Sequence, residues 1–258
     1  MDLKLKGRRV LVTGSTRGIG YGIVRAFLAE GARVMLTGRG AGLIEQRCRT
    51  LRRKHGGSRV YGFAGDLTRD DVVRLLVSEV KRIWNGLDIL VMNLGSGRSI
   101  SGTDIPPEEW RRVLDLNLVS AVETLRQAVL LLEQGVRPTA TFIGSIAGLE
   151  SVGAPVAYGA AKAALVHTMK SMTALLAPRG IRVNLVAPGN ILFRRGTWDR
   201  KLREDRENVE QMLQTQIPLQ RFGTISEVAS VVLFLASAQA SFITGSCVVV
   251  DGGQTRSA

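Results

Sequence analysis

The stretch Thr13–Gly20, TGSTRGIG, follows the apolar run Arg9–Val12 and precedes a segment with helical spacing from Tyr21 to Glu30. A strand, a glycine turn and a helix in this order form the arrangement in which backbone N–H groups at a helix N-terminus bind pyrophosphate. Gly14 permits a tight turn, Gly18 permits close backbone approach, and Gly20 permits close packing of helix on sheet. The spacing is G-x-x-x-G-x-G, and the alternative interpretation is a purely structural turn.

Apolar, β-rich runs alternate with helical patterns along the rest of the chain. This alternation predicts βαβ units, and hence a doubly wound parallel sheet with helices on both faces. No linker, repeat or low-complexity segment interrupts it, so we expect one Rossmann-like domain over residues 1–258. The predicted strands are 9–13, 33–37, 59–64, 87–92, 140–143, 181–186 and 246–250. The predicted helices are 21–30, a basic one ending near 55, 68–84 capped by Thr68, 107–132, 157–176, 200–213 and 226–236.

Composition excludes several classes of protein. Two cysteines, Cys48 and Cys247, cannot form a disulfide framework, and two histidines, His55 and His167, cannot form a multi-histidine centre. We therefore expect no metal, a partly exposed Cys48 and a buried Cys247. No apolar run is long enough to span a membrane, and residues 1–6 lack a secretory apolar region, which predicts a cytoplasmic protein.

The net charge of +13 is high for a chain of this size. Such a balance favours a polyanionic partner: nucleic acid, an anionic membrane or a phosphorylated ligand. No nucleic-acid-binding motif accompanies the charge, so we expect neither nucleic acid nor membrane as a partner. A non-catalytic binding protein on the same fold stays open as the alternative of another class.

The end of the second predicted strand bears on the choice of nucleotide. A carboxylate there would hydrogen-bond a ribose 2′-hydroxyl and repel a 2′-phosphate, but the sequence reads Thr37-Gly38-Arg39. Two guanidinium groups, Arg17 and Arg39, with the hydroxyl of Ser15, suit a dianionic phosphate. The sequence therefore predicts NADP(H) rather than NAD(H). The alternative is that Arg39 is a solvated loop residue.

Three residues further along could carry proton transfer. Ser145 follows the fifth predicted strand, and Tyr158 and Lys162 are four residues apart on a predicted helix, where they share a face. A neighbouring cation favours the phenolate and lowers the tyrosine pKa. A serine hydroxyl can hold a carbonyl or a developing oxyanion. Taken alone, Tyr-x-x-x-Lys is more often part of a solvated helix.

Taken together, these residues resemble the short-chain dehydrogenase/reductase family, and in particular its 3-oxoacyl-carrier-protein reductases. The resemblance covers essentially the whole chain and implies a Rossmann-like sheet of about seven strands and a homo-oligomer, a tetramer or dimer. The matching residues are Thr13–Gly20, Asp66-Leu67, Asn93-Leu94-Gly95, Asn117, Ser145, Tyr158, Lys162, Pro188-Gly189, Phe242–Gly245 and Val250–Gly253.

The resemblance also implies roles. Tyr158 would be the acid/base, Ser145 would orient the substrate carbonyl, Lys162 would lower the tyrosine pKa and bind the nicotinamide ribose, and Asn117 would hold a proton-relay water. The implied cofactor contacts are Gly14, Ser15, Arg17, Gly18, Ile19, Gly20, Arg39, Asp66, Leu67, Asn93, Gly95, Tyr158, Lys162, Pro188, Gly189 and the backbone of Ile191.

Two residues depart from the family pattern. Leu94 stands where the family usually has alanine, and Phe193 stands where it often has threonine. Both lie beside the expected cofactor position and leave the Ser145, Tyr158 and Lys162 set intact.

The residues fix a reaction class, the interconversion of a ketone and a secondary alcohol in a small-molecule substrate. A 3-oxoacyl thioester, on a carrier protein or CoA, is the leading substrate. Sugars, polyols or other secondary alcohols are the alternative, and a non-redox use of the cofactor site is a further one. The substrate pocket is expected from 94–105, 146–156 and 191–216. Arginines in the last segment either meet an anionic group or belong to a solvated helix with charge pairs.

Overall fold

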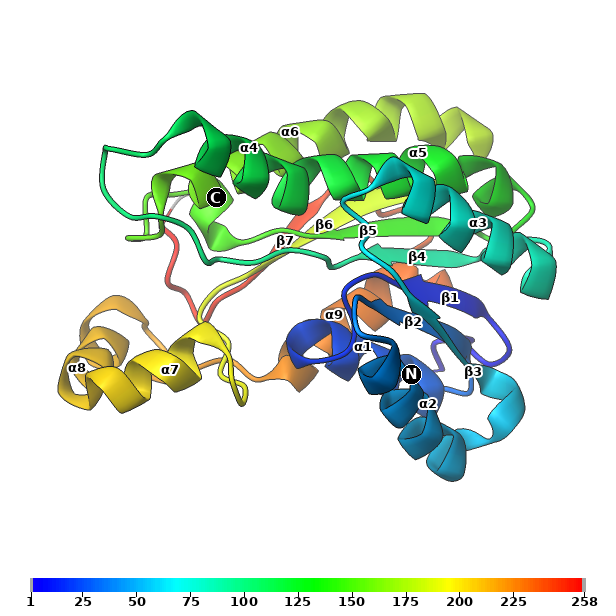
Figure 1. The fold of residues 1–258 in the computed structure, drawn as a ribbon, viewed down its shortest axis with the longest axis horizontal. Coiled ribbons are helices and arrows are strands. Elements are labelled where there is room, and N and C mark those ends of the chain that lie inside the picture. Colours follow the sequence, from blue (N-terminus) through cyan, green and yellow to red (C-terminus); the bar gives the residue numbers. More distant parts are fainter. Residues whose placement is uncertain (1, 257–258) are drawn as a thin grey trace.

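The computed structural model describes residues 2–256, whose strands form a single parallel sheet. The order across it is β3-β2-β1-β4-β5-β6-β7 (Figure 1). The chain thus starts near the middle, builds outward to β3, crosses back and builds outward to β7. The strands are β1 Arg9–Val12, β2 Arg33–Gly38, β3 Val60–Ala64, β4 Ile89–Met92, β5 Thr139–Ile143, β6 Arg182–Pro188 and β7 Cys247–Val250. The predicted fold class is confirmed.

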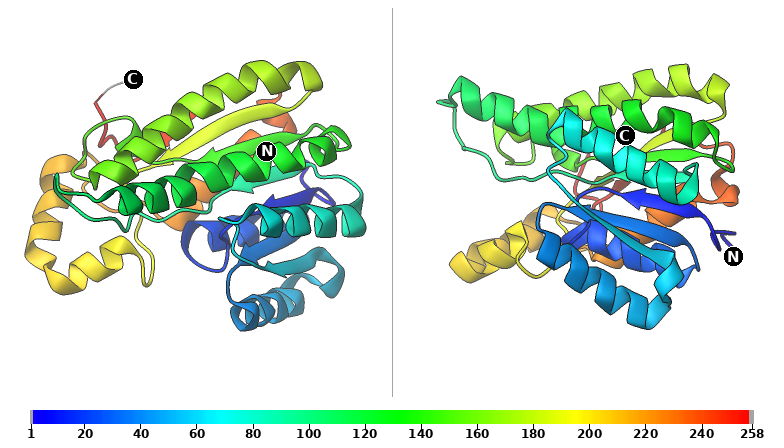
Figure 2. Two further views of the ribbon diagram at one scale, coloured as in Figure 1. Left: turned by 45° about the horizontal axis from the view of Figure 1, so that its top comes forward. Right: turned by 45° about the vertical axis from the view of Figure 1, so that its right-hand side comes forward.

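Helices cover both faces of the sheet (Figure 2). On one face α1, α2 and α9 pack on a core that includes Val10 and Val12, and on the other α3, α5 and α6 pack on a core that includes Leu11. This alternation along β1 is what a strand buried on both sides requires. The helices are α1 Gly18–Ala29, α2 Ala41–His55, α3 Asp70–Trp84, α4 Pro107–Leu114, α5 Ser120–Glu133, α6 Val156–Leu176, α7 Thr197–Glu204, α8 Arg206–Gln216 and α9 Ile225–Ala236. Short 3₁₀ turns are η1 Gly57–Arg59, η3 Ile146–Gly148, η4 Ala177–Arg179 and η5 Ala238–Ala240.

Several element boundaries differ from the predicted ones. Helix α1 begins at Gly18, within the glycine turn itself. Thr68 does not cap α3, because its hydroxyl donates to the Asp66 carboxylate at 2.8 Å and the helix starts after Arg69. The charged helix 200–213 is two helices, α7 and α8, divided at Asp205, whose side chain accepts from the Asn208 N–H. Of α1, α3 and α8, only α8 has a side-chain hydrogen bond that caps its N-terminus.

The predicted helix 107–132 contains a π-helical segment, η2, at Asp115–Val119 between α4 and α5. Such segments interrupt the regular hydrogen-bond ladder and occur often at functional sites. Asn117 lies in the middle of this one.

The burial of the two cysteine side chains is the opposite of what the sequence predicted. Cys48 is buried, because α2 packs on β3 where Gly62 leaves room for it. A Cβ atom at Gly62 would lie 2.6 Å from the Cys48 sulfur. Cys247 is half-buried.

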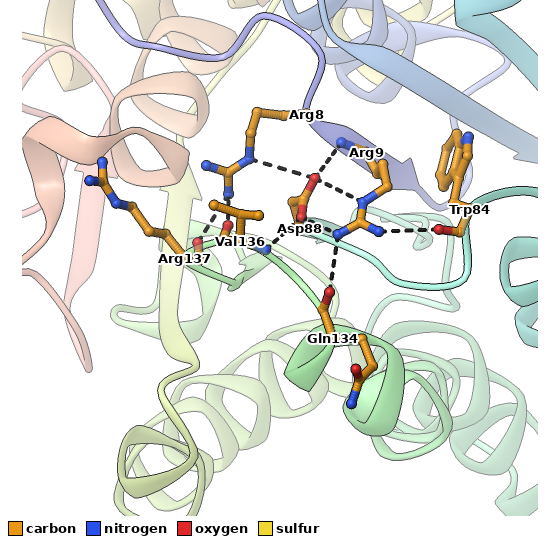
Figure 3. A network of polar contacts seen from close by, with 7 residues as sticks. All are labelled: Arg8, Arg9, Trp84, Asp88, Gln134, Val136 and Arg137. Atoms are coloured by element: carbon orange, nitrogen blue, oxygen red, sulfur yellow. Dashed lines mark hydrogen bonds and ion pairs between the residues drawn. The ribbon is translucent and has the colours of Figure 1, made fainter.

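A polar network ties the sheet together at the amino ends of β1 and β4 (Figure 3). The buried Asp88 carboxylate accepts from the Arg9 guanidinium at 2.7 Å and from the Arg9 and Val136 N–H groups, both at 2.7 Å. Arg8 lies 3.6 Å away and donates to the Val136 and Arg137 carbonyls. One carboxylate thereby joins two strands to the turn that follows α5.

No helix within residues 2–256 combines the length and the apolar character that crossing a membrane requires.

Candidate active site

The glycine turn between β1 and α1 forms one end of a cleft at the carboxyl ends of the strands. Gly14 and Gly18 have φ angles of +60° and +57°, which favour glycine. A Cβ at Gly14 would lie 2.9 Å from Leu94 Cα, and one at Gly18 would lie 2.8 Å from the Phe193 ring. The two residues that depart from the family pattern are therefore the ones packed against these glycines.

Side chains from two neighbouring strands hold this turn in place. The Thr13 hydroxyl accepts from the Asn93 and Leu94 N–H groups at 3.0 and 3.1 Å. The Asn93 amide donates to the Thr13 and Gly14 carbonyls at 3.1 and 2.9 Å. The Thr37 hydroxyl accepts from the Gly14 N–H at 3.1 Å. Asn93 thus fixes the turn as well as lining the cleft, which was not anticipated from the sequence.

Ser15 does not offer its hydroxyl to the cleft. It is fully buried, donates to the Val12 carbonyl at 2.7 Å and accepts from the Thr37 N–H at 3.0 Å. The expectation that this hydroxyl contacts a 2′-phosphate is therefore wrong, because the hydroxyl already bonds to the backbone of Val12 and Thr37. Arg17 and Arg39 are both exposed, and both line the cleft.

Helix α6 places Tyr158 and Lys162 on the opposite side of the same cleft, next to Ser145 at the end of β5. The buried Lys162 ammonium donates to the Ile143 carbonyl at 2.9 Å and lies 5.8 Å from the centre of the Tyr158 ring. The Ser145 hydroxyl also accepts from the Ala147 N–H at 3.2 Å. The three side chains expected to act together therefore meet at one place.

Burial controls the ionisation of both groups. It raises the pKa of Tyr158, and a hydrogen bond with Ser145 opposes the rise only in part. It also lowers the pKa of Lys162 to about 8. The direction for Tyr158 is opposite to the one expected from Lys162, because burial of the phenol disfavours its charged form. The tyrosine is thus a protonated phenol at neutral pH.

Asn117 lies directly behind Gly95: a Cβ on that glycine would be 2.7 Å from the Asn117 amide oxygen and 3.4 Å from Lys162 Nζ. The amide oxygen accepts from the Ser96 N–H at 2.9 Å, and the amide nitrogen donates to the Ser96 and Val113 carbonyls. The side chain therefore anchors the loop after β4, and the relay water stays a prediction.

The cleft has a volume of about 740 Å³. Among the predicted residues it brings together Gly14, Arg17, Gly18, Ile19, Arg39, Asp66, Leu67, Asn93, Gly95, Ser145, Tyr158, Lys162, Pro188 and Gly189. Ser15, Gly20, Asn117 and Ile191 are outside its lining. Gly20 packs on Asn93, and Ile191 forms a bridge with Gly223 and has a buried side chain. Between residues 2 and 256 no three His, Cys, Asp or Glu side chains form a group that could hold a metal.

Further arginines line the cleft, and none of them was predicted from the sequence to be a cofactor-binding or catalytic residue. Arg98, Arg112, Arg195 and Arg200 line it. Arg112 is bound to the Glu109 carboxylate by two hydrogen bonds of 2.6 and 2.8 Å. Arg200 lies 3.8 Å from Glu204 on α7. The charge pairs expected in the segment 191–216 are present on α7 and α8, and contact of one of its arginines with an anionic group stays a prediction.

Comparison with known proteins agrees with this geometry. A family model described as enoyl-(acyl carrier protein) reductase matches residues 14–255. The chain is 34% identical over 253 residues to 3-oxoacyl-(acyl-carrier-protein) reductase FabG of Aquifex aeolicus, covering 98% of this chain and 99% of that protein. This chain belongs to the short-chain dehydrogenase/reductase family. The predicted resemblance is confirmed.

This chain has comparable similarity to other members of the short-chain dehydrogenase/reductase family. The chain is 33% identical over 256 residues to 2-(S)-hydroxypropyl-CoM dehydrogenase 3 of Xanthobacter autotrophicus, covering 99% of both. The crystal structure of L-sorbose reductase from Gluconobacter frateurii, in complex with NADPH and L-sorbose, superposes with a TM-score of 0.93 at 29% identity and covers 100% of both chains. The short-chain dehydrogenase/reductase fold thus extends over the whole described chain, while the relatives differ in substrate.

Proposed function

We propose that this protein uses NADP(H) to interconvert a ketone and a secondary alcohol, with Tyr158 as the acid/base. The observation that carries the proposal is that Ser145, Tyr158 and Lys162 line the same cleft as the glycine turn. A dinucleotide spanning the cleft would place its reactive end beside the tyrosine.

The residues present fit such a cofactor. Gly14 and Gly18 have positive φ angles and carry no side chain, so the turn at the N-terminus of α1 can present its backbone N–H groups to a pyrophosphate. Arg17 and Arg39 are the cleft cations near the end of β2, where no carboxylate stands to repel a 2′-phosphate. The NADPH-bound L-sorbose reductase structure supports the same nucleotide.

When bound, the nicotinamide supplies a hydride to the substrate carbonyl carbon or accepts one from the alcohol. The chain's own residues manage the proton. In the reductive direction the Tyr158 phenol donates its proton to the carbonyl oxygen, which the Ser145 hydroxyl orients. The raised pKa of Tyr158 keeps that proton available at neutral pH. Lys162, held by the Ile143 carbonyl, provides positive charge beside the phenolate as it forms.

For the substrate we propose a 3-oxoacyl thioester carried by CoA or a carrier protein. The similarity to the Aquifex reductase supports this choice, and so do Arg98 and Arg195 in the cleft lining, which suit an anionic carrier. A sugar or polyol is the second candidate, favoured by the full-length similarity to L-sorbose reductase. A cytoplasmic location and a homo-oligomeric state stay predictions from the sequence.

The nucleotide is tested by comparing kcat/KM for NADPH and NADH with acetoacetyl-CoA and L-sorbose as substrates. We expect NADPH to be preferred, and Arg39→Met to lower kcat/KM for NADPH by about 10-fold or more, since a charge-assisted bond contributes about 1.5–3 kcal/mol. NADH, which has no 2′-phosphate, should be affected far less.

Arg53→Met is the control, because it removes the same charge from an exposed position on α2. It should change kcat/KM for neither NADPH nor NADH. Wild-type preference for NADH, or an equal loss with both nucleotides in Arg39→Met, would reject the 2′-phosphate assignment. Turnover of L-sorbose without turnover of the thioester would select the second candidate substrate.

A further inference from the structure

A second concavity of about 940 Å³ lies on the far side of the glycine turn. It runs between α1 and α2, and it is closed at one end by the start of α9 and the segment 192–195. We call it the basic groove. No carboxylate is among its lining residues, and its basic side chains are Arg25, Arg47, Lys54, His55, Arg194 and, shared with the catalytic cleft, Arg17 and Arg195.

No groove cation forms a salt bridge within residues 2–256. The ion pairs in that part of the chain join carboxylates to other arginines, and none includes a residue of the groove. Carboxylates near the rim are matched elsewhere: Glu227 binds Arg221 at 2.7 Å, and Asp199 binds Arg203 and the Arg195 N–H. Apart from an attraction between Arg194 and Asp199, carboxylates of the described residues therefore leave the positive charge of the groove unpaired.

The Arg47 side chain is held against the wall of the groove by two contacts. Its guanidinium donates to the Thr16 carbonyl at 3.0 Å and lies 4.6 Å from the centre of the Tyr21 ring. The remaining N–H groups of Arg47 are thereby positioned at the groove wall. Ala26 and Ala29 are small residues of α1 that line the groove, so a ligand could lie close to the C-terminal half of this helix, whereas Gly22 is packed against Ile225 of α9.

We propose that the basic groove binds a linear oligophosphate. The volume falls within the range of small-ligand sites, about 300–1,000 Å³. Repeated anionic groups match a row of cations along a helix, whereas proteins that bind single-stranded nucleic acid also stack bases on aromatic side chains. Arg47 covers the Tyr21 ring, and the Phe193 ring packs on Gly18 and Gly196. The groove thus offers charge without a stacking platform.

Histidine titration gives a direct readout, because the chain has only two histidines. Burial lowers the pKa of His55, and Lys54, Arg59 and Arg25 lower it further. Tripolyphosphate bound in the groove should raise the His55 pKa toward or above its ordinary value, measured by ¹H NMR, since an anion favours the imidazolium. His167, exposed on α6, serves as the internal reference. A His55 pKa unchanged at saturating tripolyphosphate would overturn the proposal.

Calorimetry at low salt then locates the anion. Arg25→Met/Lys54→Met removes two exposed groove cations outside the catalytic cleft and should weaken tripolyphosphate binding about 10-fold or more. Arg53→Met, on α2 but outside the groove, and Arg39→Met, in the catalytic cleft only, should stay within about twofold of wild type. Loss of binding in Arg39→Met with retention in the double variant would place the anion in the catalytic cleft and overturn the proposal. Tighter binding of a short single-stranded oligonucleotide with the same number of phosphates would also overturn it, in favour of a nucleic-acid site.

Discussion

Tyr158→Phe should lower kcat for carbonyl reduction by about 10²–10⁴-fold, the range that a positioned acid or base contributes. The substitution removes only the phenolic oxygen, so the ring that closes the cleft against Lys162 remains. Binding of NADPH should therefore be retained. Stopped-flow or steady-state absorbance of NADPH measures turnover, and nucleotide fluorescence measures binding.

Tyr61→Phe is the matched control. Its hydroxyl donates to the Ser58 carbonyl at the far edge of the sheet, so the same loss of one oxygen should leave turnover unchanged. If Tyr158→Phe kept more than about a tenth of wild-type turnover, a role as the acid/base would be rejected. If both variants lost turnover together, the loss would report on folding.

Asp88→Ala should lower the free energy of unfolding by about 3–5 kcal/mol at pH 7, the range found when one partner of a buried ion pair is removed. The substitution leaves the Arg9 guanidinium and the Val136 N–H without their acceptor (Figure 3). Urea or thermal unfolding measures the change. Asp71→Ala, which breaks an exposed pair with Arg69, should lower the free energy of unfolding far less.

The loss of unfolding free energy in Asp88→Ala should depend on pH. Burial alone would raise the pKa of Asp88, but the hydrogen bonds from Arg9 and Val136 and the charge of Arg9 outweigh it, so the pKa is lowered. A carboxylate with a lowered folded-state pKa contributes stability above its unfolded pKa, about 3.9, and loses it as the pH falls through the folded value. The difference between wild type and Asp88→Ala should therefore shrink below about pH 4. A difference that stays constant to pH 2 would show that the carboxylate charge is not its source.

The sequence predicted the sheet because buried parallel strands leave a strong pattern, as in the run Arg9–Val12. The sequence also predicted which residues lie at the carboxyl ends of the strands, because glycine turns mark where those strands end. Tyr158 and Lys162 could be paired from helical spacing alone.

Features that depend on three-dimensional neighbours could not be predicted. The Ser15 hydroxyl is used by Val12 and Thr37, which lie on two different strands. The π-helical segment around Asn117 leaves the 3.6-residue periodicity of its flanks intact. The direction of the Tyr158 pKa depends on how deeply α6 buries the phenol, which sequence spacing does not report.

The Asp88 network lies at the amino ends of the strands, whereas the catalytic cleft lies at their carboxyl ends. Substitutions in the network should then change how many molecules are folded without changing the rate of each folded molecule. In a cell the result would be a lower abundance, through proteolysis of unfolded chains, at an unaltered specific activity. Selection could thus adjust the lifetime of this enzyme and its chemistry at separate ends of one sheet.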